Sequence, residues 1–273
     1  MAIKMSNDPI ISVIMSTYND KQTIEDCIKS VLNQTFKNWE FIICDDCSND
    51  GTSDILKKYS KIDNRIIFFR NKTNKGIAKS LNTCIEKSRG KYLARMDADD
   101  KSIKNRLEKE YNLLENNTDV DIVGTNMIVE GDNGKIGVRK NDRVVTRESF
   151  LKGSPFFHPT VMMRKTALET IGGYSPYTYR CEDLELWFRF YKNGKKGLNI
   201  EEPLYVYKEN FDDLRRRNLR GAIYATRVFL NGYRDLGIPF FKRLVALKPI
   251  LSWITPNEIL NNYHKYKLQG KFK

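Results

Sequence analysis

The sequence lacks a long hydrophobic run. Nowhere in its 273 residues do about 18 consecutive apolar residues occur, which is the length that a membrane-spanning helix needs. Residues 1–9 are polar and contain no apolar core of a secretory signal,. We therefore expect no membrane span and a cytoplasmic location.

The chain has few cysteines, and their number is odd. The five cysteines are scattered along the chain, which argues against a disulfide framework and favours reduced thiols. Cys44 and Cys47 have the spacing of half a zinc or redox site, but no second cysteine pair accompanies them. A small buried residue at the end of a strand explains Cys44 equally well.

Acidic residues are nearly absent from the C-terminal region. The chain carries a formal charge of +13, yet from residue 214 onward its only acids are Asp235 and Glu258. We predict that residues 211–273 form a basic, amphipathic, helical region. Residues 240–254 mix cations with aromatic and aliphatic side chains, as interfacial segments do. Either residues 240–273 bind an anionic membrane surface, or they pack on the catalytic domain or on another subunit of a homodimer.

The first hundred residues alternate between short apolar runs and helical periodicity. Such alternation predicts right-handed βαβ units and a mostly parallel, Rossmann-like sheet flanked by helices, the α/β fold class. The predicted strands are residues 10–15, 41–44, 66–69 and 92–94, and the predicted helices carry apolar residues within 24–32, 55–59 and 77–85.

The second half is less regular. Its patterns predict strands at 122–123, 127–129 and 160–163, a hairpin turn at 131–134, a short helix over 144–151 and a helix beginning near 182–183,.

Polar residues follow three of the predicted parallel strands. Each of three groups stands just beyond a predicted strand: residues 16–19, Asp45 with Asp46, and Asp97 with Asp99 and Asp100. Ligands bind outside the carboxyl ends of such strands. Because three neighbouring acids repel one another, a divalent metal that carries a phosphorylated ligand is their natural counter-charge.

Four segments resemble, in order and spacing, the motifs of family 2 glycosyltransferases. They are residues 13–19, 45–52, 97–100 and 182–187, within a similarity that covers about residues 9–210. The resemblance implies a GT-A fold, a nucleotide-sugar donor, inversion at the anomeric carbon and a divalent metal held by a DxD motif. It also implies a catalytic domain over 1–210, with a donor half of about 1–100 and an acceptor half of about 101–210.

The resemblance further assigns the donor site. Asp46 is expected to accept a hydrogen bond from the uracil imide, which favours a UDP donor because a base without that N–H would leave a buried oxygen unpaired. Asp97 and Asp99 match the DxD pair, with Asp100 beside them as a third ligand of Mn²⁺ or Mg²⁺. The other expected nucleotide-sugar contacts are Ser16, Tyr18, Asn19 and Asp45.

Asp183 matches the general base of the family. The reaction needs a carboxylate that accepts the proton of the acceptor hydroxyl during a single, inverting displacement. Glu182 is expected to tune the pKa of Asp183 or to orient the acceptor. Without the other motifs, both acids would be ordinary first-turn residues that complement a helix dipole.

Three further residues have two interpretations each. His158 is a provisional metal ligand or diphosphate contact, with a structural histidine as the alternative. Lys75 and Lys79 stand at a strand end and helix start, where they would meet phosphate, although exposed lysines are usually only solvated.

Together these observations predict a metal-dependent transferase. It would move a sugar from a UDP-sugar to a hydroxyl of a glycan or lipid-linked saccharide, in cell-surface polysaccharide, O-antigen or capsule synthesis. The alternatives are a non-catalytic or differently specific nucleotide-sugar-binding protein and a basic nucleic-acid-binding protein. The acidic sheet edge disfavours nucleic acid. The sugar, the acceptor and the linkage stay open.

Overall fold

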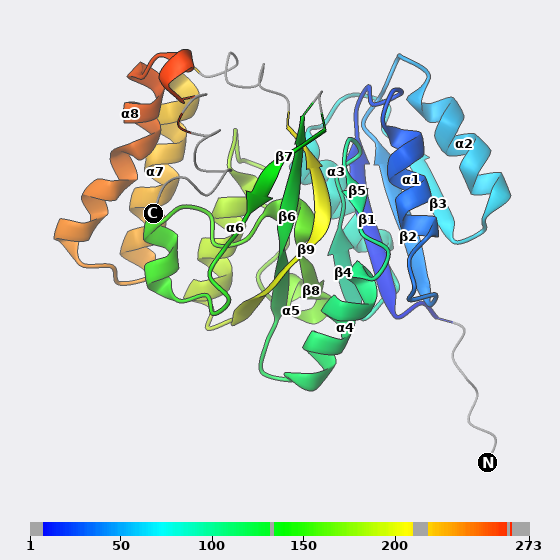
Figure 1. Ribbon diagram of the computed structural model, residues 1–273, viewed down its shortest axis with the longest axis horizontal. Coiled ribbons are helices and arrows are strands. Elements are labelled where there is room, and N and C mark those ends of the chain that lie inside the picture. Colours follow the sequence, from blue (N-terminus) through cyan, green and yellow to red (C-terminus); the bar gives the residue numbers. More distant parts are fainter. Residues whose placement is uncertain (1–7, 132–133, 210–217, 261–262, 264–273) are drawn as a thin grey trace.

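The computed structural model describes residues 8–131, 134–209, 218–260 and 263 (Figure 1). One mixed sheet forms the middle of the molecule, and helices cover both of its faces. The elements in chain order are β1 (Ile11–Thr17), α1 (Ile24–Leu32), β2 (Trp39–Asp45), α2 (Thr52–Ile62), β3 (Ile66–Arg70), α3 (Ile77–Lys87), β4 (Tyr92–Arg95), β5 (Lys101–Ser102), α4 (Arg106–Asn116), β6 (Ile122–Gly131), β7 (Gly134–Arg139), the 3₁₀ helices η1 (Arg147–Leu151) and η2 (His158–Thr160), β8 (Met162–Arg164), α5 (Lys165–Thr170), α6 (Glu182–Lys192), β9 (Gly197–Lys208), α7 (Leu219–Asp235), the 3₁₀ helix η4 (Phe240–Leu247) and α8 (Lys248–Ile254).

The first four long strands confirm the predicted parallel arrangement. They lie in the order β3-β2-β1-β4, and every neighbouring pair is parallel. In β1, Val13 packs in the core beneath α1 and α2, whereas Ile14 packs in the core beneath α3. Burial on both faces explains why this strand is apolar throughout. The carboxyl ends of β2, β1 and β4 therefore meet at one edge of the sheet.

The second half of the sheet is mixed. Strand β8 runs antiparallel to β4 and β6, β9 runs parallel to β6, and β7 runs antiparallel to β6. Gly131 and Gly134 pair across the predicted hairpin, whose two central residues lie outside the described part. The short helix predicted over 144–151 is the 3₁₀ helix η1.

The far end of the sheet curls back toward its beginning. Strand β5 pairs with β9, yet it also contacts α1, which covers β1. The Ser102 amide donates to Ser30 Oγ (3.0 Å), and Gln34 Nε2 donates to Ser102 Oγ (3.2 Å). Because β5 directly follows residues 97–100, these bonds fasten the acidic turn at its C-terminal end.

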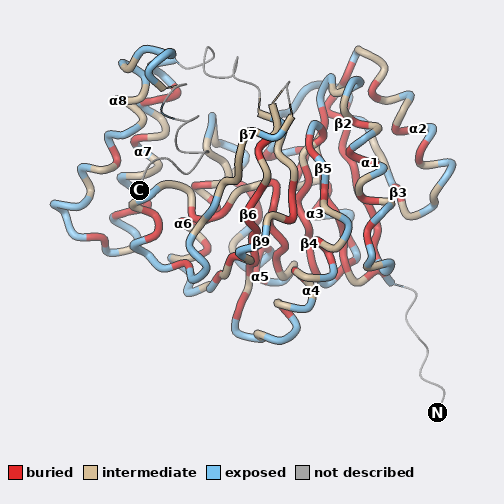
Figure 2. The backbone as a smooth tube through the Cα atoms, viewed as in Figure 1, coloured by how far each residue is buried: buried red, intermediate tan, exposed pale blue. Residues whose placement is uncertain are grey.

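The C-terminal helices extend the face that carries α6. Helix α7 packs against α6, and η4 and α8 pack on α7, so this group lies beside the second half of the sheet (Figure 1). Buried residues concentrate in the strands, whereas α7, η4 and α8 are largely exposed or intermediate (Figure 2). Among the described residues, no helix combines the length and the apolar character that crossing a membrane requires.

The contact between α6 and α7 depends on a glycine. A Cβ atom at Gly232 would lie 2.2 Å from Cγ of Phe188, whose ring is buried in the core. That separation is far below van der Waals contact, so any side chain at this position forces the two helices apart.

We predict that Gly232→Ala destabilises the protein by about 1–3 kcal/mol, the usual effect of overpacking a core. Ala is the better helix former by about 1 kcal/mol, so destabilisation would identify the clash as the stronger effect. Urea unfolding measures the change. In a Phe188→Leu background the loss should shrink, because the ring is gone. An equal loss in both backgrounds would contradict the assigned contact.

Candidate active site

The loops after β1 and β2 are bonded to each other. The Asn19 amide donates to Ser48 Oγ (2.9 Å), and Asn19 Oδ1 accepts from the Asn49 amide (2.9 Å). Asn19 has a φ of 60°, a left-handed conformation that asparagine adopts more readily than most residues. Ser16 is half-buried and the Tyr18 side chain is exposed. The two loops thus form one surface at the sheet edge, with Tyr18 open on it.

Asp45 organises the second of these loops. Its carboxylate is fully buried and accepts from the Ser48 amide (2.9 Å) and from the Ser53 hydroxyl, with Arg70 Nε 3.6 Å away. These partners satisfy both oxygens. The Asp45 carboxylate therefore faces its own loop, and its contact with the donor stays a prediction.

Asp46 ties the end of β2 to the start of α3. It is 2% exposed and accepts from Asn71 Nδ2, the Lys75 amide and the Gly76 amide, each at 2.8 Å. A carboxylate has about four acceptor positions, so one position, on Oδ2, remains. The side chains of Lys75 and Lys79 are exposed at this helix start.

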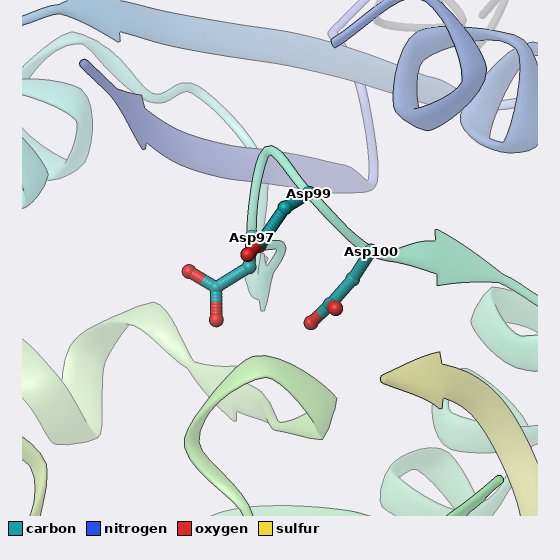
Figure 3. A group of neighbouring side chains, drawn as sticks. All are labelled: Asp97, Asp99 and Asp100. Carbon is teal, nitrogen blue, oxygen red and sulfur yellow. The ribbon is translucent and has the colours of Figure 1, made fainter. Parts of the chain in front are cut away.

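Asp97, Asp99 and Asp100 come together on the turn after β4. Each offers a carboxylate oxygen, and these atoms lie within 4.8 Å of one another (Figure 3). Asp100 Oδ1 accepts from the Lys208 amide (2.8 Å) on β9. Its Oδ2 is buried and has no hydrogen-bond partner. The turn thus holds three acids, one of them with an orphaned buried oxygen.

The electrostatics of the turn fit a hard divalent cation. Burial, and then the charge of Asp97, raise the pKa of Asp99 to about 6. The pKa of Asp100 rises well above its ordinary value for the same two reasons, with the charge of Asp99 adding to them. A cation would reverse this repulsion and give the orphaned Oδ2 a partner. Oxygen is the donor atom that Mg²⁺, Ca²⁺ and Mn²⁺ prefer.

Arg95 is the internal counter-charge of the turn. It is the last residue of β4, is 1% exposed, and forms an ion pair with Asp97. Its positive charge also offsets a small part of the rise in the pKa of Asp183 and adds to the fall that burial causes in the pKa of His158. The Arg95 guanidinium offsets the charge of Asp97 but not the charges of Asp99 and Asp100, so the turn keeps a net negative charge.

Asp183 and Glu182 begin helix α6, as predicted. The residue before them, Cys181, caps the helix in a left-handed conformation with a φ of 59°. Burial, and then the charge of Glu182, raise the pKa of Asp183 to about 6. This value is suited to a carboxylate that accepts a proton near neutral pH.

A pair of hydrogen bonds fixes the segment that leads to α6. Asn82 on α3 accepts from the Tyr174 amide at Oδ1 (2.9 Å) and donates to the Tyr174 carbonyl from Nδ2 (2.8 Å). Burial raises the pKa of Tyr174, and the charges of Glu182, Asp183 and Asp97 add to that rise. Tyr174 therefore lies within the electrostatic reach of both the acidic turn and the α6 acids.

His158 contacts two aromatic side chains. Its Nε2 lies 2.7 Å from Tyr174 Oη, and its ring centroid is 6.1 Å from that of Trp187. Burial lowers its pKa well below the ordinary value, so the imidazole is neutral. It is not a member of the three-carboxylate group. The provisional metal or diphosphate contact of His158 stays a prediction.

Sequence reasoning missed Arg95 and Asn82. An arginine at the end of an otherwise apolar strand, two residues before an aspartate, was the available signal for Arg95. Asn82 carried no such signal, because its partner Tyr174 stands 92 positions away along the chain.

The comparisons with known proteins bear on this site. Residues 12–177 match the family described as glycosyl transferase family 2. The chain is 39% identical over 270 residues to the putative glycosyltransferase EpsE of Bacillus subtilis, covering 98% of this chain and 97% of that protein. It is 29% identical over 238 residues to the UDP-Glc:alpha-D-GlcNAc-diphosphoundecaprenol beta-1,3-glucosyltransferase WfaP of Escherichia coli, covering 87% and 91% of the two chains.

The fold has solved counterparts. The mannosyltransferase PcManGT of Pyrobaculum calidifontis, in complex with GDP-Man and Mn²⁺, superposes with a TM-score of 0.67 at 17% identity, covering 94% of this chain and 79% of that one. At this identity the likeness shows the fold alone. The family match spans more than half of the chain and EpsE aligns along nearly all of it, so this chain belongs to glycosyl transferase family 2 and is a glycosyltransferase with the GT-A fold.

Proposed function

We propose that the protein transfers a sugar from a UDP-sugar to a hydroxyl of a lipid-linked or glycan acceptor, with inversion, in cell-surface polysaccharide synthesis. The observation that carries the proposal is the turn on which three carboxylates lie within 4.8 Å of one another, with the charges of Asp97 and Asp183 both acting on Tyr174. WfaP, whose name specifies UDP-Glc and a diphosphoundecaprenol-linked acceptor, is a relative along most of the chain. Residues 1–210 form the catalytic unit in this proposal, with its donor half in 1–100.

The donor base would lie on the surface formed by the loops after β1 and β2. Ser16, Tyr18 and Asn19 line it, and the one remaining acceptor position of Asp46 would receive the uracil imide N–H. Any base that lacks this donor would leave a buried oxygen unpaired. Lys75 and Lys79 stand at the start of α3, where their charges would face the phosphates.

Asp97, Asp99 and Asp100 would hold Mn²⁺ or Mg²⁺ through their carboxylate oxygens. Such an ion, when bound, offsets the negative charge that develops on the departing nucleoside diphosphate. The ion pair with Arg95 fixes the carboxylate of Asp97, and the bond from the Lys208 amide fixes that of Asp100. The ligands are thus oriented before any cation arrives.

Asp183 would act as the general base. As the acceptor oxygen attacks the anomeric carbon, its proton passes to the Asp183 carboxylate and the bond to the UDP oxygen breaks. Attack opposite the leaving group inverts the anomeric configuration. The charge of Glu182 raises the pKa of Asp183 and so makes it a stronger base.

We expect UDP, in the presence of Mn²⁺, to raise the melting temperature more than GDP or CDP does, since a ligand that binds only the native state stabilises it. Asp99→Asn should abolish the metal-dependent part of this shift and lower transfer at least about 100-fold, because one ligand of the cation is lost. Asp119→Asn is the control, because Asp119 is an exposed acid that pairs with Lys196 (3.1 Å). If UDP raises the melting temperature equally in EDTA and in Mn²⁺, the metal assignment is wrong.

For the base, Asp183→Asn should lower kcat by about 10²–10⁴-fold while UDP binding stays unchanged. The rate of the wild-type enzyme should fall about tenfold per pH unit below a pKa of about 6, because protonated Asp183 accepts no proton. Glu185→Gln is the matched control: Glu185 stands in the same helical turn but pairs with Arg189 (2.6 Å). Full turnover by the Asn variant would rule out the role of Asp183.

We also propose that η4 and α8 place the enzyme on the inner face of the cytoplasmic membrane. Large apolar side chains stand exposed there, among Lys242, Arg243 and Lys248, and no acid lies between Asp235 and Glu258. Cations beside inserted apolar groups suit an anionic bilayer, at about 1 kcal/mol for each charge near the surface. The exposed apolar residues of these two helices are Phe240, Phe241, Leu244, Leu247, Leu251, Trp253 and Ile254.

Vesicles that contain phosphatidylglycerol test this placement. The Phe240→Ser and Phe241→Ser double variant should bind them at least about tenfold more weakly than wild type, since burial of each ring is worth about 1.5–3 kcal/mol. Wild-type binding should weaken with added salt. Ile62→Ser removes an exposed apolar residue from α2 as the control. Unchanged binding by the double variant, together with a stable homodimer, would assign the face to a second subunit instead.

A further inference from the structure

A polar cavity adjoins the acidic turn. It has a volume of about 430 Å³, the space of roughly fourteen water molecules at about 30 Å³ each. Asp99, the exposed member of the three-carboxylate group, is one of the residues that line it. The start of α1, the strands β5 and β9 and the β6–β7 hairpin provide the others. A molecule in this cavity would therefore lie against a ligand of the proposed cation.

One face of the sheet forms the floor of the cavity. Val206 and Lys208 stand two positions apart on β9, so their side chains share one face. Glu130 pairs with Lys208, and Lys101 pairs with Val206, which places both on that same face. All four residues line the cavity. A glutamate and two lysines from three neighbouring strands thus converge on one space.

The wall formed by α1 is fixed in position. Lys101 Nζ lies 3.2 Å from Asp26 Oδ2, an ion pair that joins β5 to α1. The Asp20 amide, just before α1, donates to Thr52 Oγ1 (3.0 Å) at the start of α2. On the hairpin side, a Cβ atom at Gly134 would meet no atom within 4 Å. The cavity therefore has a firm wall at α1 and stays open at the hairpin.

The charges of the lining favour a neutral ligand. Lys101 offsets Asp26, and the proposed cation would offset Asp99. Glu130 and Lys208 remain, one charge of each sign. An anionic ligand would face the charge of Glu130 and a cationic ligand would face that of Lys208, and like charges brought together weaken binding.

The lining offers hydrogen-bonding groups of both kinds and little apolar surface. Within the described part of the chain, the side chains of Gln22, Glu130 and Lys208 form no hydrogen bond or ion pair with another residue. The carboxylate accepts, the ammonium donates and the amide does both. Val206 is the one large apolar residue of the described lining, and none of the lining is aromatic. An alkyl chain would leave the polar groups unused, and a nucleobase would find no ring to stack on.

We propose that this cavity binds a neutral sugar ring, whose hydroxyls bond to Gln22, Glu130 and Lys208. A hydroxyl donates one hydrogen bond and accepts two, so such a ring matches all three groups. The proposal rests on the transferase function above and adds to it that α1, the hairpin and the end of β9 take part in choosing the sugar. The sugar of the donor and a sugar of the acceptor share this chemistry.

Calorimetric titrations in the presence of Mn²⁺ test the proposal and separate the two sources. The ligands are UDP, UDP-glucose and UDP-N-acetylglucosamine, and then methyl glycosides of the same sugars with UDP present. Glu130→Gln removes a charged acceptor, and Val206→Phe fills the cavity. Each should weaken the binding of one class of sugar ligand at least about tenfold and leave UDP binding unchanged. Weaker binding of the UDP-sugars assigns the ring to the donor, and weaker binding of the glycosides assigns it to the acceptor.

Two control variants make comparable changes away from the cavity. Glu86→Gln and Ile67→Phe alter exposed positions of α3 and β3 and should leave every affinity unchanged. If UDP does not bind the wild type, the donor site is wrong, and the glycoside titration repeated without UDP still tests the cavity. Unchanged affinity of both variants for every sugar ligand, an equal loss for UDP and the UDP-sugars, or no saturable sugar binding by the wild type would each overturn the proposal.

Discussion

The arrangement of this site depends on a buried arginine beneath a cluster of acids. Arg95 ends a central strand, is almost completely excluded from water, and pairs with Asp97 on the turn that follows. Breaking a buried ion pair by removing one partner usually destabilises a protein by about 3–5 kcal/mol. The pair therefore keeps the acidic turn close to the sheet, while two of the three carboxylates stay uncompensated. In our proposal, that remaining charge attracts the divalent cation.

Helix α3 connects the two halves of the site. Its first turn is held by Asp46, at the end of β2, and its middle holds Tyr174 through Asn82. The segment after Tyr174 leads directly into α6, where Asp183 stands. The proposed donor surface and the segment that leads to the proposed base are thus bonded to the same helix. This connection joins distant parts of the chain without a disulfide.

The C-terminal helices add two features to the GT-A fold. Their inner side, where α7 carries small residues, leaves a pocket at the start of α6. Their outer side exposes large apolar residues among cations. In our proposal the outer side lies on a membrane, where a lipid-linked acceptor would also be held.

The sequence by itself determined the first four parallel strands, the helices between them, the start of α6 and the positions of the motif residues, because apolar periodicity and strand-end polarity are local properties. The sequence patterns did not predict α4, because its inward face carries the buried charged pair Arg106 and Glu110. They did not predict β9 either, because Pro203 interrupts the strand pattern,. Only the tertiary structure decided that Asp45 is internally satisfied, that His158 bonds Tyr174, and that Arg95 faces Asp97. Each of these outcomes depends on which groups meet in space, and the pocket beside α6 depends on three segments that meet only in the folded chain.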